Sequence, residues 1–378
     1  MGPSANRAAG TWAGGAVRTR FGVHLGTMLS WLPLLLAACD GEAHDSGPAA
    51  VLPECETAAT FVTWTRDQGA TLAPTTSGPE VNNYTFGIAI DPDDAHRMWA
   101  EHAGILWSSQ DAGCTWSGLG DLPTTGWVLQ AAPRVLWGYS VNEGQILRLD
   151  DAGIQTWERE DSFLGMGVDP LDPDHLRLGG KNDLTDTRDG GQSWSTVQGP
   201  GFTAYTWAFD PTDLDRVAAG SMSEGAWLSR DGGQSWAAAT GLGDKTNIFT
   251  LRWSPADADV VWAEGLDIDE ADAGADNQGR HVWRSEDGGG TFQSVVEQGG
   301  EIVLTNGVTA SADPFDRDAF SFVFGSSFGG IGTYLYRYDH GEGRTSWEQN
   351  AWDEVSAMEF SPVTPGLLYL AVVDEVID

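Results

Sequence analysis

An eight-residue motif that recurs along the chain constrains its fold more than any other feature. Residues 109–116 read SQDAGCTW, and close copies stand at residues 187–194, 229–236 and 285–292. The shared pattern is Ser/Thr-x-Asp-x-Gly-x-Ser/Thr-aromatic. Asp accepts hydrogen bonds from nearby backbone amides, and Gly adopts conformations that a side chain forbids. The motif, called the repeated turn below, is therefore predicted to form the same tight turn each time.

Short apolar stretches surround each repeated turn. A stretch ending in Asp-Pro or Ser-Pro precedes most copies, two more lie between it and the turn, and a fourth begins at the motif's aromatic residue. Proline ends a strand because it has no amide hydrogen for the ladder. Weaker copies around Asp151 and Asp339 fill the gaps, and two wider steps are interpreted as loop insertions. Four strands in about forty residues predict a β-propeller blade.

Both ends of the chain carry strands without a complete blade. Residues 358–360 and 368–372 supply a first and a second strand, whereas residues 61–65 stand alone before the first blade. The 49 Gly and 18 Trp residues also favour an all-β chain rich in turns. Since an unpaired edge strand invites aggregation, we predict a single seven-bladed propeller over residues 59–378, closed by the N-terminal strand. A six-bladed ring and a chain whose end is missing are the alternatives.

The first 38 residues are predicted to be a targeting segment. Arg7, Arg18 and Arg20 are accompanied by no acidic residue, and an apolar run follows from residue 23 to residue 38. This is the layout of a secretory signal peptide. The ending LAAC at residues 36–39 resembles the bacterial lipobox, which implies that Cys39 is lipidated and becomes the N-terminus. A plain signal peptide cleaved elsewhere is the alternative.

Residues 39–58 are predicted to form a flexible tether. They contain no apolar period and many residues that break regular structure. A lipid on Cys39 would hold the folded body at a membrane of the bacterial cell envelope, in the periplasm or at the cell surface. We expect the body to be a monomer.

Cys55 and Cys114 remain after the lipidated cysteine. An exported protein meets an oxidising compartment, so these two residues are expected to form a disulfide. Closure of the ring would bring residue 55 beside the first blade, which carries Cys114. Two buried free thiols are the alternative. Neither cysteine has His or Cys neighbours at a zinc-ligand spacing, so the sequence does not support a zinc site.

The formal net charge is −35, with Lys181 and Lys245 as the two lysines. Such a surface repels phosphate backbones, which argues against a nucleic-acid partner. One insertion, residues 267–277, is rich in carboxylates, and Asp267, Asp269 and Asp272 are candidate Ca²⁺ ligands. The insertion lacks the glycine of an EF-hand loop, and a solvated acidic loop is the alternative reading. No other cofactor is expected.

The repeated turn resembles the Asp-box, or BNR repeat, over most of residues 86–348. This repeat occurs in sialidase propellers, sortilin-type ectodomains, xyloglucan-hydrolysing glycosidases and photosystem II assembly factors. The resemblance implies that the motif residues build the fold, with the aspartate bonding its own turn and the aromatic ring filling space between blades. The residues in these structural roles are Asp111, Trp116, Asp189, Trp194, Asp231, Trp236, Asp287 and Phe292.

The repeated turn joins the third and fourth strands and therefore marks one face of the disc. By analogy with other propellers, ligands are expected on the opposite face, where the second and third strands and consecutive blades are joined. The candidates there are Glu101, His102, Trp127, Lys181, Tyr205 and Glu224. His102 beside Glu101 has the chemistry for acid–base catalysis, although a single surface His is more often without such a role.

Two functional classes remain. Resemblance to sialidases implies an early Arg-x-Pro motif, but Arg66 precedes Asp67 and Arg97 precedes Met98, which argues against that activity. The leading interpretation is a non-catalytic module that binds a protein or a glycan. The alternative is a glycoside hydrolase acting on a polysaccharide, which requires two opposed carboxylates in a deep channel.

Overall fold

The computed structural model describes residues 50–58, 61–75, 84–160, 162–325, 333–350 and 354–373. The predicted signal segment 1–38 and the predicted lipidation site Cys39 lie outside these ranges. Residues from Ser46 to Asp378 belong to one compact unit. Among the described residues, no helix is long and apolar enough to cross a membrane.

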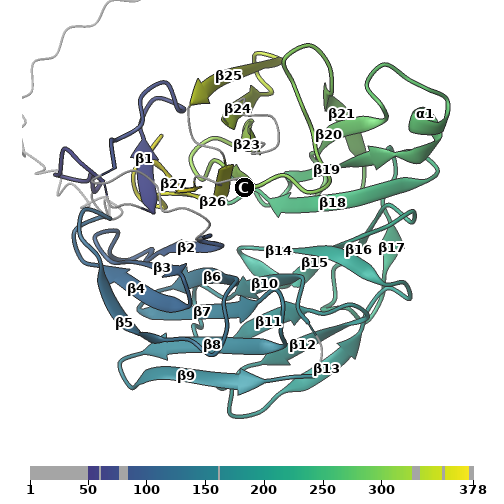
Figure 1. Cartoon of the computed structure of the whole chain (residues 1–378). Coiled ribbons are helices and arrows are strands. Elements are labelled where there is room, and N and C mark those ends of the chain that lie inside the picture. Colours follow the sequence, from purple (N-terminus) through teal and green to yellow (C-terminus); the bar gives the residue numbers. More distant parts are fainter. Residues whose placement is uncertain are drawn as a thin grey trace, which may run out of the picture. The chain divides into compact units, whose positions relative to one another are not determined.

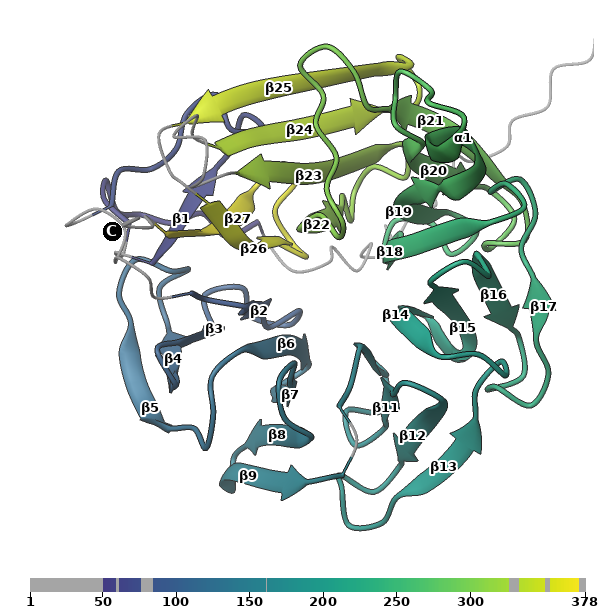
Figure 2. The ribbon, with the colours of Figure 1, turned by 45° about the vertical axis from the view of Figure 1, so that its right-hand side comes forward.

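Seven antiparallel sheets form the blades of a β-propeller, which confirms the predicted all-β fold (Figures 1 and 2). In six of them the four strands follow chain order from the channel outward. Blades 1 and 2 comprise β2 (Gly87–Ile90), β3 (Met98–His102), β4 (Ile105–Ser109), β5 (Ser117–Asp121), β6 (Trp127–Ala132), β7 (Val135–Ser140), β8 (Gln145–Asp150) and β9 (Gly153–Glu158). Blades 3 and 4 comprise β10 (Gly165–Val168), β11 (Leu176–Gly179), β12 (Asp183–Thr187), β13 (Ser195–Gln198), β14 (Ala204–Asp210), β15 (Asp213–Ser221), β16 (Ala226–Ser229) and β17 (Ala237–Ala238). Blades 5 and 6 comprise β18 (Thr246–Trp253), β19 (Val261–Asp267), β20 (Arg280–Ser285), β21 (Phe292–Glu297), β22 (Ala310–Ala312), β23 (Ala319–Gly325), β24 (Thr333–Asp339) and β25 (Arg344–Asn350), with helix α1 (Ile268–Asp272) between β19 and β20.

The seventh blade joins the two ends of the chain. It contains β26 (Glu354–Phe360), β27 (Leu368–Val373) and the N-terminal strand β1 (Val62–Thr65), in the order β1-β27-β26. The register pairs Val62 with Ala371 and Thr65 with Leu368. The N-terminal strand therefore closes the ring, as predicted from the incomplete ends.

The seventh blade also contains a repeated turn that the sequence reading missed. Residues 65–72 read TRDQGATL, and Leu72 replaces the aromatic residue of the other copies. The Thr71 amide donates to Asp67 at 2.8 Å and the Gly69 amide to Thr65 Oγ1 at 2.8 Å, the bonds found in the other turns. Leu72 then pairs with Thr65 in a single bridge that begins a rudimentary fourth strand.

The bonding within the repeated turn explains its composition. In blade 4, Asp231 accepts hydrogen bonds from the amide and the hydroxyl of Ser235 at 2.9 and 2.6 Å, and Ser229 Oγ accepts from the Gly233 amide at 2.7 Å. Gly233 has a φ of 91°, which disfavours any residue with a side chain. Hydrogen bonds from Ser235 and Ser229 lower the pKa of Asp231 to about 2. The turn therefore relies on an ionised carboxylate.

In blades 1, 3, 4 and 5, the repeated turn is hydrogen-bonded to the chain segment that joins the first and second strands of the same blade. The Gly190 amide donates to the Asp174 carbonyl and the Gly232 amide to the Asp215 carbonyl, both at 3.0 Å. These loops and the repeated turns therefore lie on the same face, called the turn face below. The opposite face, called the connection face, carries the joins between the second and third strands and between blades.

Arginine–aspartate ion pairs bridge consecutive blades on the turn face. Each arginine lies on a strand of one blade, and the aspartate lies at the first join of the next blade. The pairs are Arg148–Asp174 (2.5 Å), Arg177–Asp215 (3.1 Å), Arg216–Asp259 (3.5 Å) and Arg284–Asp318 (2.6 Å). Arg148, Arg177, Arg216 and Arg284 of this acidic chain thus form ion pairs at the contacts, called seams below, between consecutive blades.

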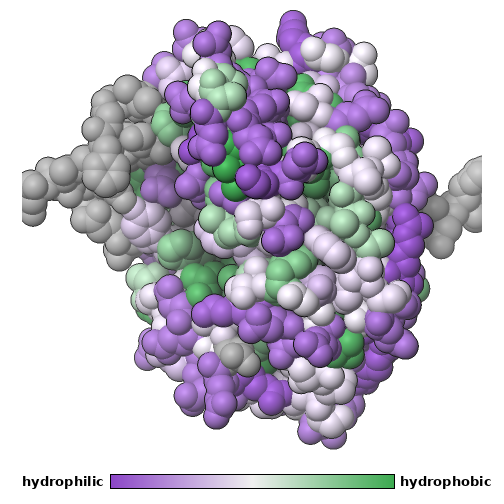
Figure 3. All heavy atoms as spheres, turned by 90° about the vertical axis from the view of Figure 1, so that its right-hand side faces the viewer, coloured by the Kyte–Doolittle hydropathy of each residue, from purple (hydrophilic) through white to green (hydrophobic). Residues whose placement is uncertain are grey.

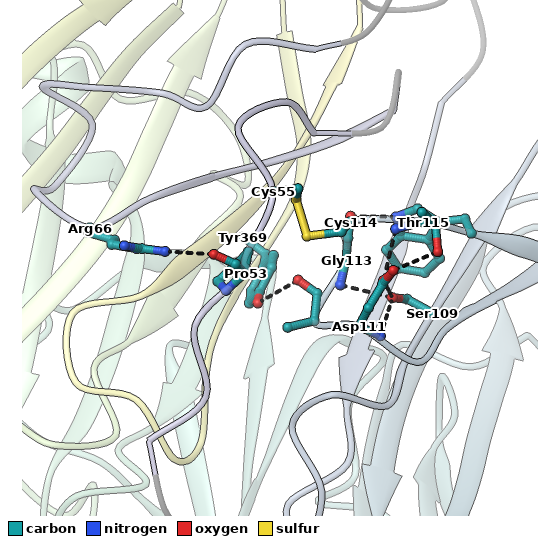
Figure 4. The surroundings of a disulfide bond; sticks show 11 residues. Pro53, Cys55, Arg66, Ser109, Asp111, Gly113, Cys114, Thr115 and Tyr369 are labelled. Carbon is teal, nitrogen blue, oxygen red and sulfur yellow. Dashed lines mark hydrogen bonds between the residues drawn. A yellow bond between two sulfur atoms is a disulfide. The ribbon is translucent and has the colours of Figure 1, made fainter.

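A disulfide links Cys55 to Cys114, with the two Cα atoms 5.8 Å apart (Figure 4). Cys114 lies in the repeated turn of blade 1, and Cys55 lies in the segment before β1. Tyr369 of β27 donates to the Ala112 carbonyl at 3.0 Å beside the disulfide. The seam between blades 7 and 1 is thus covalently fastened.

Residues 51–58, which belong to the predicted tether 39–58, are bonded to the folded body. The Val51 amide donates to Thr364 Oγ1 at 2.8 Å, and Arg66 donates to the Pro53 carbonyl at 3.1 Å. These bonds and the disulfide hold residues 51–58 on blade 7. The composition of this segment did not predict its attachment, because the hydrogen bonds involve backbone groups, which do not require a periodic pattern of apolar residues.

Replacing both cysteines, Cys55→Ser with Cys114→Ser, should lower the free energy of unfolding. The disulfide closes a loop of 59 residues. A loop of that length corresponds to about 4 kcal/mol of lost chain entropy in the unfolded state. Urea unfolding of wild type and variant measures the difference. A reductant should bring the wild type to the variant's midpoint and leave the variant unchanged; equal midpoints without reductant would contradict this role.

Replacing Asp231 with Asn should destabilise the propeller at neutral pH. Because the pKa of Asp231 is lowered to about 2 on folding, its contribution is complete above the carboxyl pKa of the unfolded chain, about 4. That contribution is lost as the pH falls through the folded value. The wild type and Asp231→Asn should therefore converge in thermal midpoint on acidification, whereas exposed Asp244→Asn should match the wild type throughout. A gap that does not depend on pH would refute the ionic role.

Candidate functional site

Glu101 and Trp127, two candidates for ligand contact, are fully buried. Glu101 lies one residue before the end of β3, and its carboxylate accepts hydrogen bonds from the amides of Gly104, Gly126 and Trp127 at 2.9, 3.2 and 3.3 Å. Burial raises the pKa of Glu101, although these hydrogen bonds act in the opposite direction. The two residues lie beneath the loop that joins blades 1 and 2, and neither side chain is accessible to a ligand on the surface.

His102 is also buried and is engaged in packing. Its Nδ1 lies 2.9 Å from Thr85 Oγ1, and its ring stacks on Phe61 with centroids 4.5 Å apart. Phe61 directly precedes β1. His102 therefore fastens blade 1 to the closing segment, which corrects the acid–base role considered for it beside Glu101.

Lys181, Tyr205 and Glu224 are exposed on the connection face. Tyr205 is 43% exposed, and the edge of its ring packs against Phe249 with centroids 5.7 Å apart. Half of the predicted ligand-face residues thus lie where a partner can reach them. Whether such a side chain is buried or exposed depends on which side of its strand it lies and on the direction of the chain where the strand ends.

The acidic insertion is built around a short helix rather than a metal ion. Asp267 caps α1, its carboxylate accepting from the amides of Asp269 and Glu270 at 3.0 and 3.1 Å. Asp269 lies 3.6 Å from Lys245 Nζ. Within the described residues, no group of three or more His, Cys, Asp or Glu side chains is arranged to hold a metal. Of the predicted Ca²⁺ ligands Asp267, Asp269 and Asp272, Asp267 thus caps the helix and Asp269 lies near Lys245.

His281 of β20 fastens the insertion to blade 5. Its Nε2 lies 2.9 Å from Glu270 Oε2, and its Nδ1 lies 2.8 Å from Ser294 Oγ. Hydrogen bonds from His281 and then Asn277 lower the pKa of Glu270. Sequence reasoning missed this group because its members lie far apart and follow no motif.

Two charged side chains stand out among the strands that line the channel. Three residues before the proline at the end of the first strand, blades 5 and 7 carry Arg252 and Glu359. The residues at this position in blades 1, 3, 4 and 6 are small: Ala89, Gly167, Ala208 and Ser311. Blade 2 carries Gln130 at this position, so Arg252 and Glu359 are the charged residues among the seven, and both are solvent-accessible.

The channel pair is one carboxylate and one guanidinium. Arg252 donates to the carbonyls of Ala310 and Leu251 at 3.0 and 2.9 Å. Glu359 lies inside the ring of blades, where it contacts less bulk water than on an open surface, which raises its pKa to about 7, while the charge of Arg252 acts in the opposite direction. These two positions therefore do not supply the opposed carboxylates of a glycoside hydrolase.

Glu264 is the counterpart of Glu101 in blade 5. Both follow Trp-Ala in the second strand, at residues 99–101 and 262–264. Glu264 is fully buried, which raises its pKa to about 8, and neither of its carboxylate oxygens has a hydrogen-bond partner among the described residues. Glu101 thus connects the second strand of blade 1 to the start of blade 2 by hydrogen bonds, whereas Glu264 occupies the equivalent position in blade 5 without such bonds.

Replacing Glu264 with Gln should change how stability depends on pH. Because its pKa is raised on folding, the wild type is favoured below the unfolded value of 4.5 and loses stability as the pH rises toward about 8. Glu264→Gln keeps the neutral shape. The thermal midpoints should be similar near pH 5 and should separate at alkaline pH in favour of the variant, with exposed Glu297→Gln following the wild type. Parallel profiles would rule this out.

Comparison with known proteins places the chain among its relatives. No protein-family model matches it. It is 36% identical over 366 residues to the dispase autolysis-inducing protein of Streptomyces mobaraensis, spanning 93% of this chain and 98% of that protein. The chain belongs to the family of the dispase autolysis-inducing protein. The described geometry is thus the geometry of a member of that family.

Solved structures share the fold at low identity. An ancestral GH74 enzyme has a TM-score of 0.55 and 16% identity over 78% of this chain, which spans 44% of that enzyme. YCF48 from Cyanidioschyzon merolae has a TM-score of 0.52 and 14% identity over 77% of this chain and 96% of its own. The structure of YCF48 bound to D1 peptide has a TM-score of 0.52 and 13% identity, over 86% of this chain and 100% of its own. At such identities the likeness shows the propeller fold alone.

Proposed function

We propose that this chain is an exported propeller that binds a protease and promotes the self-cleavage of that protease, without chemistry of its own. The observation that carries the proposal is the 36% identity along nearly the whole length of a protein named for inducing autolysis of dispase. A match that covers 93% of this chain favours a shared surface as well as a shared fold.

The geometry of the described side chains supports a binding role. Glu101 and His102 are occupied in packing, and the channel position carries one carboxylate, Glu359, and one guanidinium, Arg252, on different blades. The exposed candidates Lys181, Tyr205 and Glu224 are residues that contact a partner without needing reactive neighbours.

The setting of the protein is part of the proposal. A signal peptide over residues 1–38 and lipidation at Cys39 would place the propeller at a membrane of the cell envelope, where a disulfide persists. The repeated turns are proposed to be Asp-boxes, whose role is to build the fold. The protein is proposed to act as a monomer that binds no nucleic acid.

Glycan binding and glycoside hydrolysis are the competing functions. The likeness to the GH74 enzyme is one of fold, at 16% identity. No contact among the described residues favours a sugar ligand over a protein. Release of reducing sugar from a polysaccharide by the purified protein would overturn the present proposal.

Addition of the purified protein to dispase should speed the loss of intact dispase. Gel densitometry over time measures this loss, with the protein omitted as the reference. Irreversibly inactivated dispase is the control: it should bind the protein but remain intact, because the protein itself cuts nothing. Cleavage of inactivated dispase would reveal an enzyme, and unchanged autolysis without binding would reject the proposed function.

A further inference from the structure

We infer that the connection face is the docking surface for the partner protease, through two apolar patches set among carboxylates. This inference rests on the proposed function and names the surface that performs it. It also names the partner's chemistry: a protein surface with apolar side chains bordered by Lys and Arg.

The first apolar patch crosses blades 1 and 2. Phe86 and Val141 are 39% and 36% exposed. A Cβ at Gly126 would lie 3.2 Å from Val141 Cγ2 and 3.8 Å from Phe86 Cδ2, so the two side chains flank this glycine. Tyr84 stacks on Phe86 with centroids 5.7 Å apart. Glu101 holds the join beneath the patch through the Gly126 amide at 3.2 Å, which gives the patch a rigid base.

The second apolar patch lies on blade 4. Tyr205 and Met222 are 43% and 47% exposed. The pairing of Ala204 with Ser221 brings these two residues to the same end of the blade. An aromatic ring and a methionine next to each other suit an adaptable apolar contact. Clustered exposed apolar side chains are typical of protein-binding surfaces.

Carboxylates border both patches. Glu143 lies two residues after Val141, and Glu224 lies two residues after Met222; both are exposed. Helix α1, with acidic residues in its first turn and no buried residue, stands on the same face. Figure 3 views the molecule from the side on which α1 lies and shows pale and hydrophobic residues in a band between hydrophilic ones. Such a border attracts a basic partner and repels an acidic one.

The turn face offers a weaker surface. Its charges largely pair with one another across the seams, as in Arg177–Asp215 and Arg284–Asp318. Its exposed apolar residues include Leu171 and Phe315, which occupy the same position of the proline loops of blades 3 and 6, on separate blades. Phe315 is 47% exposed, like the connection-face residues, and Leu171 is 92% exposed, so these two accessible apolar residues serve as controls.

The test measures binding of the full chain to inactivated dispase by biolayer interferometry. A variant with Phe86→Ser, Val141→Ser, Tyr205→Ser and Met222→Ser should lose about tenfold or more in affinity, the loss expected when central apolar contacts are truncated. The control variant with Leu171→Ser and Phe315→Ser should bind like the wild type. Thermal unfolding confirms that both variants are folded.

A second variant, Glu143→Lys with Glu224→Lys, changes only exposed side chains. It should weaken binding at low salt and remove part of the salt dependence, because the border then repels a basic partner. Wild-type affinity in both connection-face variants, or loss of affinity in the turn-face control alone, would overturn this inference while leaving the proposed function intact. Absence of binding by the wild type would overturn both.

Discussion

The pairing of β1 with β27 is the interaction on which the rest of the structure depends. Each blade buries its apolar faces against its two neighbours, so an open ring would expose the facing surfaces of blades 7 and 1. One continuous core contains Trp64 from β1, Ile88 and Met98 from blade 1, and Tyr369 from β27. Closing this seam therefore buries side chains that come from both ends of the chain, and the disulfide and the seventh repeated turn lie along it.

The sequence predicted the blades and their closure because both follow from spacing. Strands of fixed length between recurring turns leave few arrangements, and a strand without a partner must find one. The turn at residues 65–72 escaped notice because Leu72 replaces an aromatic residue, although Thr65, Asp67 and Gly69 were all in place. The hydrogen bonds of the Asp and the Ser/Thr form without the aromatic residue, which in three other copies is a Trp that adds packing and one bond from its indole to the Gly carbonyl.

The candidate site was harder to predict because burial depends on packing in three dimensions. The order of the strands predicted which face carries Glu101, Trp127 and Tyr205. It did not predict which of these side chains is exposed on that face. Glu101 is drawn inward by three backbone amides that the sequence does not mark. Likewise, Asp267 caps a helix too short to leave a periodic pattern. The two faces of the disc consequently differ: ion pairs fasten the seams on one, and carboxylates border apolar patches on the other.

Hydrogen–deuterium exchange of the protein alone and with inactivated dispase tests most directly the claim that this propeller is a protein-binding module. The account predicts slower exchange in the complex for peptides covering residues 84–87, 141–145, 203–206 and 222–225, with unchanged exchange in the repeated turns. Slower exchange confined to the repeated turns, or no change in any peptide, would contradict it.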